Sequence, residues 1–224
     1  MSIVPASEQA QEEAVGLCAE LIRFDTSNPT SDERAAADWV VARLAEAGIE
    51  SVLVESAPGR ANVIARIAGA DPSRGALLVH GHLDVVPADA SEWQVPPFSG
   101  EIRDGYLWGR GAIDMKDTVA VMLATARHFA RTGTRPARDL VLAFLADEAV
   151  RAEDPDGHPV PYCNPGGTDA KAFTHLGIRC FGFKGLKLPH DLDYGRLFHG
   201  VDERVPLEGL RFGVRVMTRL WQSC

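Results

Sequence analysis

The apolar residues of the first fifty positions recur at helical spacing and predict two helices. The first helix is capped by Ser7 and ends before the polar turn at residues 25–29. A second helix is predicted from about residue 32 to residue 47, with Gly48 as its end. The apolar positions of the first helix follow three- and four-residue steps: Ala14, Leu17, Cys18, Leu21 and Ile22. Both helices are therefore expected to cover a core with one face.

Strand-like segments follow these helices. Residues 49–54, 62–67, 76–81 and 139–146 are apolar runs bounded by turn residues. The segment 76–81 is more apolar than the two before it, and we expect it at the centre of a sheet. A third helix is predicted directly after Asp114. Strands that alternate with helices predict a three-layer α/β domain.

The rest of the chain changes in character. Residues 100–108 predict a hairpin, whereas residues 150–161 are polar, proline-rich and aperiodic and predict a linker or long loop. Beyond this loop we expect a short helix after residue 169, a strand at 178–183 and a last helix starting at Pro206. This strand has no other sheet to join. We therefore expect one domain, in which residues 150–224 complete the sheet begun by residues 1–149.

Composition and charge narrow the classes of function. The chain has 224 residues, 46% hydrophobic and 24% charged, which is ordinary for a soluble globular protein. Its 23 Lys and Arg against 31 Asp and Glu disfavour nucleic-acid binding. The first residues do not resemble a signal peptide and no apolar run reaches membrane-spanning length, so we expect a cytoplasmic protein without a membrane partner. The four cysteines form no C-x-x-C pair, which argues against a disulfide framework and a Cys-rich zinc site.

Residues 77–87 begin as an apolar strand and carry His82 and Asp84 at its end. In an extended segment residues two apart point to the same side, so these side chains are expected to touch. A metal-ligand histidine is built in this way, because a carboxylate holds the N–H that faces away from the metal. A solvated hydrogen-bonded pair has the same sequence, and this stretch alone leaves both interpretations open.

Three further polar residues occupy comparable places. Asp114 follows a glycine-rich loop and precedes a helix, where a plain N-cap explains it equally well. Glu148 lies just beyond the carboxyl end of the apolar strand 139–146, where open α/β sheets place their chemistry. His199 lies in a loop before the last helix. A single sheet would bring these residues and His82 to one edge.

Several motifs, taken in order, resemble one known family. They are HGHLDVVP at 80–87, GRGAIDMK at 109–116, LADE at 145–148, GGTDA at 166–170 and HGVDE at 199–203. The chain resembles the co-catalytic zinc metallopeptidases and amidohydrolases that include acetylornithine deacetylase, succinyl-diaminopimelate desuccinylase, carboxypeptidase G and aminoacylase. This resemblance implies a three-layer α/β/α, zinc-peptidase-like catalytic domain with a mixed, mostly parallel sheet.

The resemblance also implies roles for the metal-site residues. It makes His82 a ligand of one zinc ion, with Asp84 as the carboxylate that supports it. It makes Asp114 the carboxylate that bridges two zinc ions and His199 a ligand of the second ion. These side-chain types suit zinc, which prefers nitrogen, sulfur and carboxylate ligands.

The implied reaction is hydrolysis of an amide or peptide C–N bond in small N-acyl amino acids or peptides. Zinc polarises the scissile carbonyl, while Glu148 acts as the general base that takes a proton from water. Gly167 and Thr168 are the implied substrate-binding residues.

The sequence departs from the family in two places. Ala149 stands where the family has a second Glu that binds zinc, and the family's lid domain, used for dimerisation and for gripping the substrate carboxylate, has no counterpart here. We therefore expect one tightly bound zinc ion or fewer, and no family-type dimer. Glu153, Asp154 and Asp156 are alternative ligands, although a solvated acidic loop is the simpler interpretation.

Two hypotheses follow for the function. The first is a zinc-dependent hydrolase with a reduced set of ligands. The second is a truncated, catalytically impaired scaffold that folds and binds metal weakly. Zinc content and hydrolysis of N-acyl amino acids would distinguish them.

Overall fold

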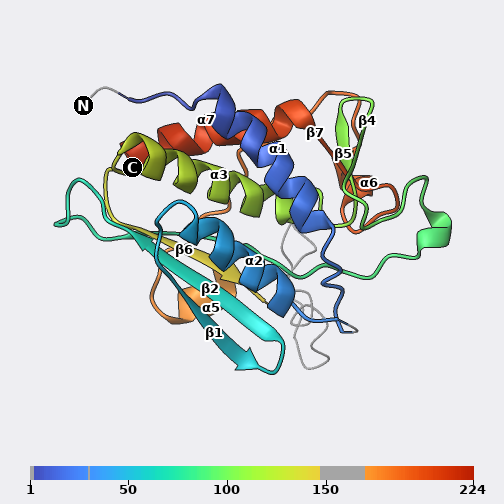
Figure 1. The fold of residues 1–224 in the computed structure, drawn as a ribbon, viewed down its shortest axis with the longest axis horizontal. Helices are drawn as coiled ribbons and strands as arrows, with labels where there is room; N and C mark the ends of the chain where they lie inside the picture. The colour runs from blue at the N-terminus through green and yellow to red at the C-terminus, as the bar shows by residue number, and fades with distance from the viewer. Residues whose placement is uncertain (1–2, 30, 147–169) are drawn as a thin grey trace.

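The computed structural model describes residues 3–29, 31–146 and 170–224 (Figure 1). Its helices are α1 (Glu8–Ile22), α2 (Arg34–Ala45), α3 (Lys116–Thr132), α5 (Ala170–His175), α6 (Tyr194–Leu197) and α7 (Leu207–Ser223), with a 3-10 turn at Ala90–Glu92. Its strands are β1 (Ser51–Ala57), β2 (Arg60–Ile67), β3 (Leu77–His82), β4 (Glu101–Arg103), β5 (Tyr106–Trp108), β6 (Leu140–Leu145) and β7 (Arg204–Pro206). The helices and strands predicted before residue 147 are therefore confirmed. Within the described ranges, no helix is long and apolar enough to cross a membrane.

Four strands form one mixed sheet in the order β1-β2-β6-β3. β3 runs parallel to β6, whereas β1 pairs with β2, and β2 with β6, in antiparallel fashion. The sheet is mixed as expected, but its described strands are not mostly parallel, because a short turn joins β1 to β2 as a hairpin. The prediction that segment 76–81 is central is also wrong for these strands. β3 lies at one edge of the four strands, and β2 and β6 are the inner strands. Leu142 and Phe144 of β6 are fully buried.

Helices lie on both faces of this sheet. α2 contacts β1 and β2, and α3 contacts β3, while α1 and α7 pack on α3 (Figure 1). A Cβ atom at Gly81 would lie 3.1 Å from Val119 of α3, so His80 of the same strand points to the opposite face. There the His80 ring lies 5.1 Å from the ring of Phe173 in α5. This arrangement confirms the three-layer α/β/α order.

Among the described residues after 169, no strand joins this sheet, contrary to our prediction. Residues 178–183 form no strand, and Phe181 and Phe183 are 82% and 53% exposed. A short apolar run forms a strand only when the edge of another strand is free to pair with it. The sequence of the run does not reveal whether such an edge exists. In the described residues after 169, the strand that forms is β7, which pairs with β5 in a second sheet of order β4-β5-β7.

α7 connects the C-terminal part to the core. Its Leu210, Val214 and Trp221 are fully buried in the hydrophobic cluster that α1 and α3 also line. The Trp221 ring meets the Phe129 ring of α3 edge to face, with 5.7 Å between the ring centroids. This packing places the loop before β7 beside the loop before α3.

Candidate metal centre

His82 ends β3 and is followed by Asp84, and both residues are buried. His82 Nδ1 lies 3.0 Å from the backbone carbonyl oxygen of Asp84 and 3.4 Å from its carboxylate Oδ1. The predicted contact between these residues is therefore present, with the carbonyl as the nearer acceptor. Because Nδ1 is engaged on this side, Nε2 points away from Asp84 and toward Asp114.

Asp114 lies between two histidines that come from distant parts of the chain. Its Oδ1 lies 3.3 Å from His82 Nε2, and its Oδ2 lies 2.8 Å from His199 Nε2. The Asp114 side chain is 15% exposed, whereas that of His199 is 53% exposed. The structure thus brings together His82, Asp84, Asp114 and His199, four of the residues that the sequence singled out. Asp114 is not the N-cap of α3, because Met115 takes that position.

The charges of these groups depend on one another. Burial lowers the pKa of His82, but hydrogen bonds to Asp114 and Asp84 outweigh burial and hold this pKa well above its ordinary value. The hydrogen bond to Asp114 also raises the pKa of His199. Burial acts to raise the pKa of Asp114, yet the two histidines hold it below its usual range. Asp114 is therefore ionised at neutral pH and suited to face a cation.

The donor spacing can be compared with that of a zinc site. Two ligand atoms on one tetrahedral zinc ion lie about 3.3–3.5 Å apart, because the Zn–N and Zn–O bonds are about 2.0–2.2 Å long. The 3.3 Å between His82 and Asp114 has this spacing, whereas the 2.8 Å contact of His199 is a direct hydrogen bond. In the part of the chain that the structure describes, no three His, Cys, Asp or Glu side chains form a group that could hold one ion. His82 and Asp114 thus have the spacing of two ligands of one ion, whereas His199 and Asp114 do not.

The remaining predicted residues lie outside the described ranges. These are Glu148, Gly167 and Thr168, together with Ala149 and the acidic residues of the segment 153–156. Their roles stay predictions.

A buried polar network behind Asp84 was not predicted. Asn28 Nδ2 donates to Asp84 Oδ2 and to Glu33 Oε1, each at 3.1 Å. Arg60 Nη1 donates to Glu33 at 2.8 Å and also to Asn28. An amide with two N–H donors between two carboxylates fixes both of them. The sequence predicts a polar turn at residues 25–29, and only the tertiary structure reveals the partners of Asn28.

Glu203 is a further buried carboxylate beside the centre for which no contact was predicted. It is fully buried, and its Oε2 lies 2.7 Å from Nη1 of the buried Arg110. Its signal in the sequence is its place in the motif 199–203, four residues after His199, but the resemblance assigned it no role.

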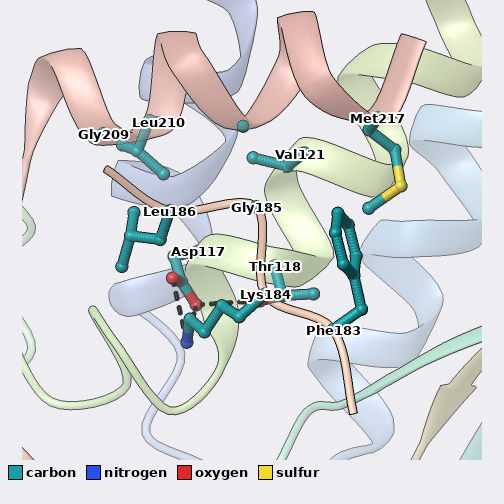
Figure 2. Close-up of a pocket in the computed structure, with 11 residues that line it drawn as sticks. Asp117, Thr118, Val121, Phe183, Lys184, Gly185, Leu186, Gly209, Leu210 and Met217 are labelled. Atoms are coloured by element: carbon teal, nitrogen blue, oxygen red, sulfur yellow. Dashed lines mark hydrogen bonds and ion pairs between the residues drawn. The ribbon is translucent and has the colours of Figure 1, made fainter. Parts of the chain in front are cut away.

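Lys184 also contacts the loop that carries Asp114. The segment around Lys184 crosses α3 and α7, and its side chain reaches Asp117 (Figure 2). Lys184 Nζ lies 3.1 Å from Asp117 Oδ2 and donates to the carbonyl of Ile113. The hollow beside this ion pair has a volume of about 20 Å³, which holds one water molecule and is too small for a substrate.

The three-layer fold defines the chain as an α/β protein, and a carboxylate between two histidines marks its candidate metal centre. Residues 78–157 match the sequence model of Peptidase family M20/M25/M40. This part of the chain is similar to that family, as its motifs predict.

Curated proteins are similar to this chain over part of its length. Succinyl-diaminopimelate desuccinylase of Cereibacter sphaeroides is 40% identical over 141 residues, which cover 62% of this chain and 36% of that protein. Aminoacylase-1 of Dictyostelium discoideum is 31% identical over 141 residues, which cover 62% of this chain and 34% of that protein. The chain thus spans about a third of the length of these relatives.

Solved structures share the fold. An M20 family metallo-carboxypeptidase, Sso-CP2 of Sulfolobus solfataricus, superposes with a TM-score of 0.55 at 24% identity, covering 62% of this chain and 31% of that one. Human carnosine dipeptidase 1 gives a TM-score of 0.52 at 24% identity, covering 62% and 33%. At these identities the likeness concerns the fold alone, and it confirms the expected α/β class.

Proposed function

We propose that this chain is a zinc-dependent hydrolase of amide or peptide C–N bonds in small N-acyl amino acids or peptides. One observation carries the proposal: the two oxygens of Asp114 face Nε2 of two different histidines, at 3.3 Å for His82 and 2.8 Å for His199. A carboxylate with one nitrogen donor beside each oxygen is suited to lie between two cations. The names of two relatives, a desuccinylase and an aminoacylase, support acylated amino acids as the substrate class.

Each residue of the centre has a separate task in this proposal. His82 and Asp114 would hold one zinc ion, and Asp114 and His199 the second. Bound zinc supplies a Lewis acid that polarises the scissile carbonyl and lowers the pKa of water. Asp84 contacts His82 Nδ1 and so keeps Nε2 directed at the centre. Glu148 accepts the proton of the attacking water and passes it to the leaving amine.

We expect one zinc ion or fewer to be held tightly. A catalytic zinc usually has three protein ligands and a water. His82, Asp114 and His199 supply three ligands only if all three bind the same ion. Ala149 also removes a negative charge that would offset the repulsion between two dications, so the second ion is disfavoured twice.

The second candidate function is a catalytically impaired scaffold that folds and binds metal weakly. Ala149 favours this alternative because it removes a ligand that the family relies on. The coverage favours it as well, because the chain spans only about a third of the length of these relatives.

The two candidates are separated by measuring zinc and turnover on the same preparation. Purified protein would be dialysed against a mild chelator, analysed for zinc and assayed with a panel of N-acyl amino acids. His82→Ala tests the centre. His190→Ala is the matched control because His190 is exposed and is not one of the candidate ligands.

The hydrolase proposal expects about one zinc per chain or less, with both zinc and hydrolysis lost in His82→Ala and kept in His190→Ala. Zinc without hydrolysis of any substrate would favour the scaffold. Two retained zinc ions would overturn the expected stoichiometry and point to ligands from the segment 153–156 or from a second chain. Unchanged zinc content in His82→Ala would overturn the assigned centre.

A further inference from the structure

We propose that Glu203 is a positioning residue of the centre. It holds together the loop of residues 109–115, which carries Asp114, and the loop of residues 198–203, which carries His199. The inference rests on the proposed function, because it concerns the geometry of the same centre. It goes beyond that function because Glu203 is not a ligand there and touches no substrate.

The Glu203 carboxylate accepts four hydrogen bonds. Its Oε2 accepts from Arg110 Nη1 at 2.7 Å and from the Gly111 N–H at 3.1 Å. Its Oε1 accepts from the Ile113 N–H at 2.8 Å and, more weakly, from the Asp114 N–H at 3.3 Å. Both oxygens are thereby used by donors of the loop before α3. A carboxylate in this state shapes the loop and has no free lone pair for a metal ion.

Arg110 connects this carboxylate to the second loop. Its side chain is 4% exposed, and its Nη2 donates to the carbonyl oxygens of His199 and Pro87, each at 3.4 Å. The guanidinium carbon lies 5.2 Å from the centroid of the Trp93 ring, which keeps the group in place. Glu203 and His199 belong to one short segment. The ion pair of Arg110 with Glu203 therefore fixes the positions of both Asp114 and His199.

Two substitutions of Glu203 separate its charge from its shape. In Glu203→Gln an amide replaces one oxygen, so an N–H group meets N–H donors and part of the loop loses its acceptor. In Glu203→Asp the charge remains, but the carboxylate is one methylene further from the loop. Arg110→Lys keeps the positive charge and removes the planar fork that contacts the two loops.

Glu13→Gln is the matched control. Glu13 is also a largely buried carboxylate paired with arginine, at 2.6 Å from Arg127 and 2.6 Å from Arg131, and its side chain is 17% exposed. It joins α1 to α3 and contacts no residue of the centre. A variant that merely loses a buried ion pair should behave like Glu13→Gln.

Two measurements test the inference. The first is the zinc dissociation constant, by competition with a chromophoric chelator, together with the visible absorption spectrum of the cobalt-substituted protein. The second is the ¹⁵N spectrum of the histidine rings in the metal-free protein at fixed pH, where loss of the Asp114 contact moves the His199 signals. Asp114→Asn supplies the reference position for that loss.

We expect Glu203→Gln to raise the zinc dissociation constant about 10–100-fold, as loss of a supporting partner of a ligand does. We also expect it to alter the cobalt spectrum and to move the His199 signals toward those of Asp114→Asn. Glu13→Gln should change none of these. If Glu203→Gln does not fold, Glu203→Asp and Arg110→Lys should show the same shifts in smaller size.

The inference is overturned if the Glu203 and Arg110 variants lose stability as Glu13→Gln does, with unchanged zinc affinity and unchanged His199 signals. If the wild-type chain binds no zinc, the proposed function fails. The metal-free histidine spectrum would still decide whether Glu203 holds His199 against Asp114.

Discussion

Two residues of the loop before β7 have a backbone conformation that their own type disfavours. His199 has φ = 57° and Asp202 has φ = 59°. For residues other than glycine this region costs about 1–3 kcal/mol each unless neighbouring contacts impose it. Asp202 is held by Gln94, whose backbone N–H and side-chain Nε2 donate to its carboxylate at 2.9 and 2.7 Å. The direction of the His199 ring is therefore set by tertiary contacts, among them those of Arg110.

Replacing Glu148 by Gln tests the general base that the resemblance implies. We expect Glu148→Gln to keep the wild-type zinc content, because the proposed base is not a ligand. Hydrolysis of the best N-acyl amino acid should fall about 10²–10⁴-fold, the usual effect of losing a proton acceptor. Zinc analysis and kcat on the same sample give both quantities.

Glu153→Gln is the companion variant for this prediction, because Glu153 is an acidic neighbour in sequence whose simpler interpretation is a solvated side chain. It should change neither zinc nor kcat. Loss of zinc together with activity in Glu148→Gln would show that Glu148 has taken the ligand position that Ala149 leaves empty, and loss of zinc in Glu153→Gln would identify Glu153 as a substitute ligand.

At the scale of helices and strands, the sequence correctly predicts the features that depend on neighbouring residues, such as helix caps and tight turns. The α1 helix follows its cap at Ser7, whose side chain accepts from the Ala10 N–H, and the hairpin turn lies at Asp104 and Gly105 as the dipeptide indicates. The place of β3 in the sheet and the absence of a strand at 178–183 could not be read in this way. Both features depend on which strands pair along their edges, and the paired strands are far apart in the sequence.

The residues of the centre also divide into those that the local sequence reveals and those that depend on distant partners. His82, Asp84, Asp114 and His199 were found because their side-chain types and motifs carry the signal. Glu203 was missed because its partners are largely backbone N–H groups, which every residue but proline offers and which leave no mark in the sequence.

The contact between α1 and α3 predicts a dependence of stability on pH. His128 of α3 is buried, and its Nδ1 lies 3.4 Å from the hydroxyl of Ser7 at the start of α1. Burial lowers the pKa of His128 below its ordinary 6.5, although a hydrogen bond to the Pro5 carbonyl acts in the opposite direction. Between the lowered pKa and 6.5, the unfolded chain binds more protons at this position than the folded chain. The free energy of unfolding therefore falls as pH decreases below 6.5.

Urea unfolding of the wild type and of His128→Gln from pH 7.5 to pH 5 isolates this contribution. The variant lacks the titrating group, so the stability advantage of the wild type should shrink as pH falls. His190→Gln removes an exposed histidine, and its difference from the wild type should stay constant. Parallel curves for wild type and His128→Gln would contradict the prediction.

At the scale of the whole molecule, the segment after residue 169 contributes side chains both to the hydrophobic core and to the centre. Its α7 adds Leu210, Val214 and Trp221 to the core cluster. Glu203 contacts Arg110 in the loop before α3, and Lys184 contacts Asp117 in the first turn of α3. The His199 ring reaches Asp114 on the same loop. The centre is thus built across two stretches of chain that are far apart in sequence.

This arrangement predicts that the two stretches stay together when the chain between them is cut. A recognition site for a sequence-specific protease would be inserted between Asp156 and Gly157 and cleaved in the folded protein. The fully buried apolar side chains of α7 contribute about 1.5–3 kcal/mol each through burial, and that contribution does not depend on an intact backbone. We therefore expect the two fragments to elute together in size exclusion and to keep the circular dichroism of the uncut chain.

The cut protein in urea is the control, because the fragments should separate once the core is unfolded and join again when urea is removed. A second control, Trp221→Ala, removes the largest fully buried side chain of α7 and about 3–5 kcal/mol of packing, so that its cut form should come apart at a lower urea concentration. Release of two stable halves from native cut protein would instead show that residues 1–149 and 150–224 are separate domains, and the proposal of one domain would then be wrong.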